Sequence, residues 1–192
     1  MSKPAHTLRF ATLLLLACVL PNQTRAESPP APNAGEPRDG QHDFDFMFGT
    51  FNIKVRRLKN PLHGSNEWYE MSGTTVCRPF WNGKANIEEG ELDGPNGHVE
   101  AAMVRLYNTT SHQWSLNWVT QRSARFDVPT IGEFKDGRGE FYDMEPYEGR
   151  QIMVRYVWSD TTTSRPHFQQ SYSADGGKTW ELNWDAYSTR VQ

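Results

Sequence analysis

Short runs in which apolar and polar residues alternate dominate the chain from residue 43 onward. In Gln151–Trp158, the residues Ile152, Val154, Tyr156 and Trp158 fall on one face, and the residues between them fall on the other. A period of two is that of a β-strand with one buried face. No amphipathic helix of three turns is evident, so the pattern predicts an all-β domain.

Ten strands are predicted, with turn signals such as Asp136-Gly137 between successive runs. Their ranges are Thr50–Leu58, Trp68–Arg78, Asn86–Glu91, Val99–Tyr107, Gln113–Thr120, Thr130–Lys135, Gly139–Asp143, Gln151–Trp158, His167–Ser173 and Thr179–Thr189. The short connections indicate an antiparallel meander. Such strands form either a sandwich or a closed barrel, and closure removes exposed strand edges. We predict a single antiparallel β-barrel of about ten strands.

Aromatic residues favour the barrel, because all seven tryptophans follow residue 42, often at every second position. The repeated sequences WSLNW (114–118) and WELNW (180–184) predict two equivalent strands, each with its two tryptophans and its leucine on one face. Two interpretations remain open. The aromatic rings either fill the barrel core, or they line a cavity for a flat or apolar ligand.

The N-terminal residues have the pattern of a signal peptide. Lys3 and Arg9 precede the apolar run 11–20, and a small-x-small site ends at Ala26. The run is about half of the roughly 20 residues that span a bilayer, and no later segment is long and apolar enough. We therefore expect residues 1–26 to be a signal peptide, the protein to be exported to the periplasm or secreted, and no transmembrane segment.

A second interpretation of this segment is a lipobox at LLAC (15–18), in which Cys18 would carry a lipid anchor. Cleavage after Ala26 is the preferred interpretation. The following residues, 27–42, contain four prolines and almost nothing apolar, which predicts a disordered spacer. Residues 43–192 then form one barrel domain.

Charge argues against a nucleic-acid-binding protein, and cysteine content argues against a disulfide-stabilised one. Removing residues 1–26 takes away three of the 20 basic residues and no acidic residue, which leaves 17 against 23. This acidic balance argues against nucleic acid as a partner. Cys77 is then the one remaining cysteine, so no intrachain disulfide can form, and we expect a buried, inert thiol.

The sequence SADGGKTW (173–180) resembles the Asp-box of sialidases and other β-propellers. A propeller needs several copies and a much longer chain. We therefore interpret the single copy as a hairpin: Asp175 accepts backbone hydrogen bonds, Gly176 and Gly177 supply positive φ, and Trp180 covers the turn.

Several stretches carry a resemblance to a known family. DFDFMFGTF (43–51) is similar to the G-x-W opening of the lipocalin-like (calycin) superfamily, with Phe51 in place of Trp. RLYNTTSHQW (105–114), GEFYD (139–143) and the Asp-box stretch resemble a group of bacterial lipocalin-like proteins of unknown function. The resemblance implies a lipocalin-like barrel in which Arg190 packs as a cation on Phe51. It implies little about activity.

Arg105 interrupts the alternating strand AAMVRLY (101–107), and if its face points inward it must be paired. Glu88 is the predicted partner, with Asn86 on the same face. Either this is a structural ion pair, or Arg105 binds an oxygen anion of a ligand while Glu88 or Tyr142 transfers a proton.

The histidines are scattered without metal-ligand spacing, so we predict no metal site and no cofactor. Two hypotheses of function follow. The first is an exported barrel that binds a small apolar or aromatic molecule through Asn86, Trp118, Tyr156 and Trp184. The alternative is a cofactor-independent lyase, isomerase or cyclase that uses Arg105, Glu88 and Tyr142 in the same cavity. The sequence leaves open whether the protein is an enzyme.

Overall fold

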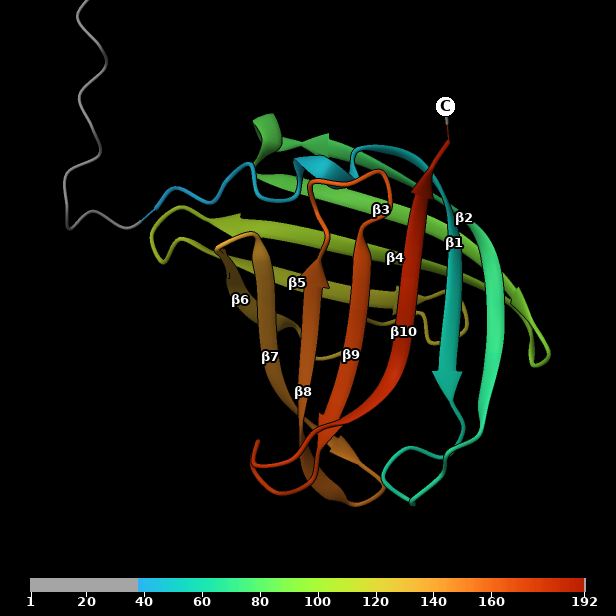
Figure 1. The fold of residues 1–192 in the computed structure, drawn as a ribbon. Helices are drawn as coiled ribbons and strands as arrows, with labels where there is room; N and C mark the ends of the chain where they lie inside the picture. The colour runs from blue at the N-terminus through green and yellow to red at the C-terminus, as the bar shows by residue number, and fades with distance from the viewer. Residues whose placement is uncertain (1–37, 192) are drawn as a thin grey trace, which may run out of the picture. The chain divides into compact units, whose positions relative to one another are not determined.

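The computed structural model describes residues 38–191, which form one closed antiparallel barrel (Figure 1). Its ten strands are β1 (Gly49–Leu58), β2 (Trp68–Phe80), β3 (Ala85–Gly94), β4 (Gly97–Asn108), β5 (Gln113–Thr120), β6 (Thr130–Lys135), β7 (Arg138–Tyr147), β8 (Arg150–Ser159), β9 (His167–Ser173) and β10 (Glu181–Arg190). Each strand pairs with its neighbours in sequence, and β1 pairs with β10 to close the barrel. The all-β meander barrel predicted from the alternation is confirmed.

All ten predicted strands are present, and three of them, β5, β6 and β9, have the predicted bounds. The largest difference is in β7, which was expected to end at Asp143 but continues to Tyr147. Pro146 is tolerated because it lies one residue from the strand end, beside the Glu148-Gly149 turn. The predicted signal peptide, Cys18 and most of the predicted spacer lie outside the described residues.

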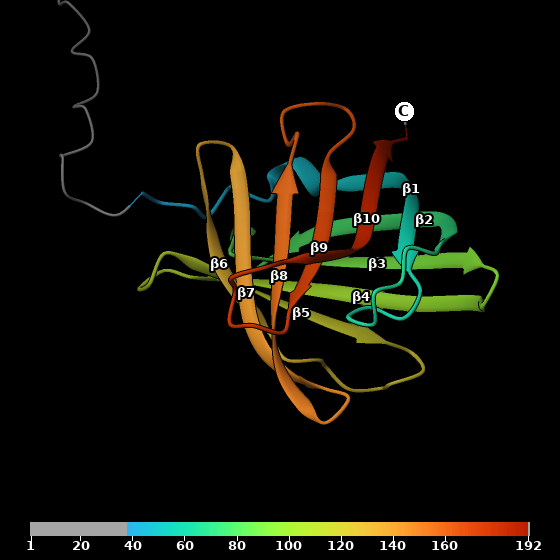
Figure 2. The ribbon, with the colours of Figure 1, turned by 60° about the horizontal axis from the view of Figure 1, so that its bottom comes forward.

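The opposite walls of the barrel cross at a steep angle, with β3, β4 and β5 running behind β7 to β10 (Figures 1 and 2). Such crossing follows from the tilt that strands need in order to close a barrel. In β8, Ile152, Val154 and Trp158 are buried inside, as the period of two predicted, and the intervening Arg155 lies against Trp180 on the outside.

The expected shared face of Trp180, Leu182 and Trp184 is wrong. The register of β10 against β9 shifts between Leu182 and Trp184, so that Leu182 pairs with Ser171 and Trp184 pairs with Gln170. One extra residue in a strand reverses the side on which later side chains emerge. Trp184 therefore faces the interior, whereas Trp180 lies outside against Tyr142, with ring centroids 6.0 Å apart.

The Asp-box is a hairpin between β9 and β10, as predicted. The Asp175 carboxylate accepts hydrogen bonds from the backbone N–H groups of Lys178 and Thr179, at 3.0 and 2.9 Å, and from the Thr179 hydroxyl at 2.7 Å. These donors hold the pKa of Asp175 well below its usual range. Gly176 and Gly177 have φ of +73° and +85°.

The chain before β1 closes one end of the barrel. Phe44 precedes the 3₁₀ turn Asp45–Met47, and Met47 ends it. Both are fully buried among Trp114, Phe141 and other aromatic residues. The contacts start before the predicted domain boundary at residue 43, because the Trp114 indole donates a hydrogen bond to the Gly40 carbonyl at 2.9 Å. We call residues 38–48 the N-terminal plug.

Arg190 packs on Phe51, as the resemblance implied, and also stabilises the plug. Its guanidinium lies 4.5 Å from the centre of the Phe51 ring and donates hydrogen bonds to the carbonyls of Phe48 and Phe46, at 2.5 and 2.7 Å. Gly49 is required here for two reasons: its φ is +113°, and a Cβ atom would lie 2.8 Å from the Arg190 guanidinium.

Replacing Arg190 by Gln should lower the free energy of unfolding by about 1–3 kcal/mol, because one cation–π contact and two charged hydrogen bonds are lost. Arg165→Gln is the matched control. Arg165 lies 4.1 Å over the Tyr187 ring without a side-chain hydrogen bond, so its loss should cost less than about 1 kcal/mol. Urea unfolding followed by tryptophan fluorescence measures both, and equal losses would contradict a special role for Arg190.

Candidate ligand-binding cavity

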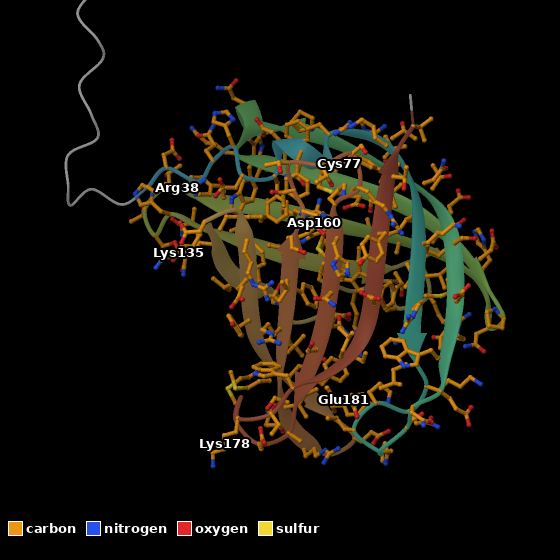
Figure 3. The ribbon with its side chains drawn as sticks, viewed as in Figure 1. Arg38, Cys77, Lys135, Asp160, Lys178 and Glu181 are labelled. Atoms are coloured by element: carbon orange, nitrogen blue, oxygen red, sulfur yellow. The ribbon has the colours of Figure 1, made fainter. Side chains whose placement is uncertain are left out.

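The barrel is filled at the plug end but hollow beyond it. A cavity of about 200 Å³ lies inside, lined by aromatic residues from β5, β8, β9 and β10. They are Trp118, Tyr156, Trp158, Phe168, Tyr172 and Trp184. Figure 3 gives the orientation of the barrel: Cys77 and Asp160 lie toward the plug end, and Lys178 and Glu181 lie toward the opposite end.

The structure places three of the predicted binding residues, Trp118, Tyr156 and Trp184, in the cavity wall. The Trp118 and Trp184 rings meet edge to face, with centroids 6.4 Å apart. Tyr156 packs on Phe168 with centroids 5.1 Å apart. These edge-to-face contacts hold the rings in the wall, and the Arg57 guanidinium lies 5.3 Å over the Trp184 ring.

Arg105 lies at the cavity floor with its side chain only 1% exposed. It pairs with Glu88 and donates a hydrogen bond from Nη1 to the Asn86 side-chain oxygen at 3.0 Å. The register explains this cluster, because Arg105 is directly opposite Asn86 on β3 and diagonal to Glu88. The predicted pairing of these three residues is therefore present. Asn86 lies behind Arg105 and is fully buried, and it does not line the cavity.

Aromatic rings cover the Arg105 guanidinium on two sides. Its centre lies 4.8 Å from the Phe44 ring of the plug and 5.5 Å from the Trp158 ring. Cation–π attraction and the Glu88 carboxylate together offset the cost of burying this charge. Arg105 thus connects the plug on one side to the cavity on the other.

Cys77 is buried beside this cluster, as expected. Its sulfur is 3.6 Å from the Asn86 side-chain oxygen and 3.8 Å from Arg105 Nη1. Burial raises the pKa of the Cys77 thiol to about 11 in spite of the nearby guanidinium. The thiol therefore stays protonated at neutral pH and is a poor nucleophile.

Tyr142 is not part of this arrangement. It lies on the outer surface of β7, where its hydroxyl donates a hydrogen bond to Glu140 at 2.6 Å. The alternation of β7 explains its position, because Phe141, which is fully buried, points inward. The structure does not bring Tyr142 together with Arg105 and Glu88, so it offers no support for proton transfer between them.

Two carboxyl groups in the cavity wall and a third beside them were not predicted. Glu145 and Asp127 line it, and Asp143 precedes Glu145 by two residues on the same face of β7. Burial, followed by the nearby Glu145 and Asp127, raises the pKa of Asp143 to about 7. Burial also raises the pKa of Glu145 and of Asp127. The alternation of GEFYD already places Asp143 on the face of Phe141, and extending it through Tyr147 would have placed Glu145 on that face as well.

Asp127 reaches the cavity because β5 and β6 pair over only three residues, Trp114 to Leu116 on β5. Beyond Leu116, the loop 121–129 covers this side of the barrel. It is held by a bridge between Val119 and Phe126 and by a hydrogen bond from the Asp127 N–H to the Trp118 carbonyl at 2.9 Å.

Comparisons with known proteins add no identification: no protein-family description matches the chain, and neither does any curated protein. The closed barrel is compatible with the lipocalin-like fold, and the family itself stays a prediction. Within residues 38–191, no helix is long and apolar enough to cross a bilayer. The same residues contain no group of three His, Cys, Asp or Glu side chains placed to hold one metal ion.

Glu88→Gln should lower the free energy of unfolding by about 3–5 kcal/mol, because it leaves the buried Arg105 charge without a countercharge. Glu89→Gln, at the next position, is the control: Glu89 pairs with Arg78 on the exposed outer face, and its loss should cost less than about 1 kcal/mol. Urea unfolding compares the two variants. A loss for Glu88→Gln no larger than for the control would show that the Arg105 pair contributes little.

Asp143→Asn should change how stability depends on pH. The pKa of Asp143 is about 7 in the folded protein and 3.8 without its surroundings. Between these values the folded state binds a proton that the unfolded state releases, so stability falls as the pH rises from about 4 to 7. Asparagine does not ionise, so the variant should be more stable than the parent protein at pH 8, with a smaller difference at pH 4.

Urea unfolding at pH 4, 6 and 8 tests this dependence, with Asp160→Asn, an exposed site at the plug end, as the control. A stability difference between Asp143→Asn and the parent protein that does not change with pH would contradict the assignment.

Proposed function

We propose that this protein binds a small organic molecule with an aromatic or flat apolar body inside the barrel. The observation that carries the proposal is the division of the interior. A cluster of buried aromatic and apolar side chains packs on the plug side of Arg105, whereas a cavity of about 200 Å³ on the other side is lined in part by aromatic rings. Protein interiors are otherwise close-packed, and a cavity of this size costs stability unless it serves a ligand.

The size and chemistry of the cavity limit the ligand. Cavities for drug-sized molecules measure about 300–1,000 Å³, so a cavity of 200 Å³ suits a molecule of one or two rings. For about ten non-hydrogen atoms, roughly −0.7 kcal/mol per atom gives a Kd of about 10 µM. Met71 and Met103 in the wall supply adaptable side chains that can fit around such a ligand.

We further propose that the barrel acts outside the cytoplasm, in the periplasm or as a secreted protein. The sequence of residues 1–26 supports export, and LLAC (15–18) supports the alternative of a lipid anchor at Cys18. Within residues 38–191 the one cysteine, Cys77, is free, and a barrel held by its own core is compatible with either form.

An enzyme that works in the same cavity without a cofactor is the second candidate function. One observation favours it: Asp143 lies beside Glu145 of the cavity wall on the same face of β7, and burial raises its pKa to about 7, which suits proton transfer at neutral pH. In that case Asp143→Asn would abolish turnover of a compound that the variant still binds.

A cavity-filling variant tests the binding function. Ala101→Phe places a ring in the cavity that Ala101 lines, whereas Ala102→Phe, one position along β4, places the same ring on the outer face. The probe is 2-phenylethanol, observed by saturation-transfer NMR. The parent protein and Ala102→Phe should bind it equally, and Ala101→Phe should bind it at least about ten-fold more weakly. Equal binding by both variants, or a parent protein that binds neither 2-phenylethanol nor a charged compound with the same ring, would contradict the proposal.

A further inference from the structure

The charges that face the cavity do not balance. Arg57, Glu88, Arg105, Asp127 and Glu145 line it, and Asp143 lies beside Glu145 on the same face of β7. Glu88 neutralises Arg105. Three carboxyl groups then remain against the single guanidinium of Arg57, which lies 5.3 Å over the Trp184 ring. The other titratable groups in the wall are the hydroxyls of Tyr156 and Tyr172.

The three carboxyl groups also have no partner inside the protein. In the part of the chain that the structure describes, the side chains of Asp127, Asp143 and Glu145 form no ion pair and accept no hydrogen bond, and one Asp143 oxygen is completely buried. A carboxylate removed from water without a partner is destabilising, so such groups either take up protons or attract a cation.

Polar atoms elsewhere in the wall point independently to a ligand. Thr75 is only 6% exposed and lines the cavity, and its hydroxyl has no hydrogen-bond partner. The indole N–H of Trp158, which is 5% exposed and lines the same cavity, also has none. Buried polar groups are rarely left without a partner in folded proteins, so these two atoms are suited to a polar substituent of the ligand.

The carboxyl groups share the cavity with aromatic rings. Trp118 and Trp184 lie edge to face in its wall, and Tyr172 is a further ring there. The negative faces of aromatic rings attract organic cations, and the attraction increases when water is excluded. Carboxylates and ring faces together are the chemistry that recognises a protonated amine.

We propose that the ligand is an organic cation, an amine that carries an aromatic ring. Its ammonium group lies toward Asp127 and Glu145, its ring lies beside Trp118 and Trp184, and a polar substituent reaches Thr75 or Trp158. Among the described residues, no three carboxyl, thiol or imidazole groups converge in the way that a metal ion requires, which favours a larger organic cation over a metal ion. This inference rests on the proposed function, because it names the ligand class of the same cavity.

An anionic ligand is less well supported, although Arg105 faces the cavity. The Nη atoms of Arg105 donate to Asn86 and Glu88, and the Glu88 carboxylate already balances the guanidinium charge. Within residues 38–191 the Nε–H group has no partner, so Arg105 keeps a donor for a neutral acceptor, whereas a second carboxylate there would add an excess negative charge. Arg57 is the remaining cation, and three carboxyl groups outweigh it.

Three probes with the same ring and different charge test the inference: 2-phenylethylamine, 2-phenylethanol and 3-phenylpropanoate. Isothermal titration calorimetry at pH 7.5 and low salt gives their affinities. The amine should bind about ten-fold more tightly than the alcohol, and the carboxylate should bind most weakly. Amine binding should also release protons, seen as a dependence of the heat on the buffer, because a nearby cation lowers the pKa of the three carboxyl groups.

Glu145→Gln should reduce the advantage of the amine over the alcohol to less than about three-fold, with the affinity for the alcohol unchanged. Glu133→Gln is the matched control, because it removes the same charge from the exposed outer face of β6 and should preserve the preference. If Glu145→Gln lowers the stability of the protein, Asp127→Asn, in the loop 121–129, provides the same test.

The outcomes separate this inference from the proposed function. Equal affinity for the amine and the alcohol, or tighter binding of the carboxylate, would overturn the cation preference and leave a binding barrel. A preference that survives both Glu145→Gln and Asp127→Asn would overturn the role of these carboxyl groups. If the folded protein binds none of the three probes, both proposals fail.

Discussion

The buried charge of Arg105 is the constraint on which the interior of this barrel depends. A guanidinium that is 1% exposed must find its partners within the protein, and it does so in two directions. Glu88 and Asn86 on the neighbouring strand supply the polar contacts, and the rings of Phe44 and Trp158 supply the apolar ones. Phe44 belongs to the plug, and Arg105 also lines the cavity. The Arg105 side chain therefore lies at the boundary between the packed half of the barrel and the cavity.

A second arginine, Arg190 near the C-terminal end of the barrel, stabilises the N-terminal plug. Arg190, at the end of β10, contacts the Phe51 ring and the carbonyls before β1, so the last strand fixes the segment that seals the barrel. The pairing of β1 with β10 brings these parts together. On the side of the barrel where β5 and β6 pair over only three residues, the loop 121–129 and its Asp127 take part in the wall.

The features that could be predicted are those that follow from a period of two. The alternation of apolar and polar residues predicted the ten strands. It also predicted that Arg105 lies inside with Glu88 and Asn86, and that Trp118 and Tyr156 face the interior, where they line the cavity. Three features could not be predicted in this way: the register shift in β10, the carboxyl groups at the cavity wall and the extent of the plug. The register shift beside Asn183 reverses the faces of β10 and sends Trp180 outward, and it is decided by backbone pairing rather than by side-chain type.

The carboxyl groups were missed for another physical reason. Pro146 indicates a strand end, and acidic residues are usually solvated, so the residues after Asp143 were not expected to continue β7 into the interior. The plug was underestimated because its backbone, at Gly40, is held by the distant side chains of Trp114 and Tyr107. Hydrophobic patterning does not reveal contacts of this kind, which depend on the tertiary fold.

Native mass spectrometry of the protein purified from the cells that make it measures the occupancy of the cavity most directly. The spectrum of the folded protein is compared with that of the same sample after denaturation. A binding barrel predicts a mass excess of one small molecule that disappears on denaturation, and the mass identifies the ligand. A folded protein that carries no extra mass, and gains none when 2-phenylethanol or 2-phenylethylamine is added, would contradict a ligand-binding cavity.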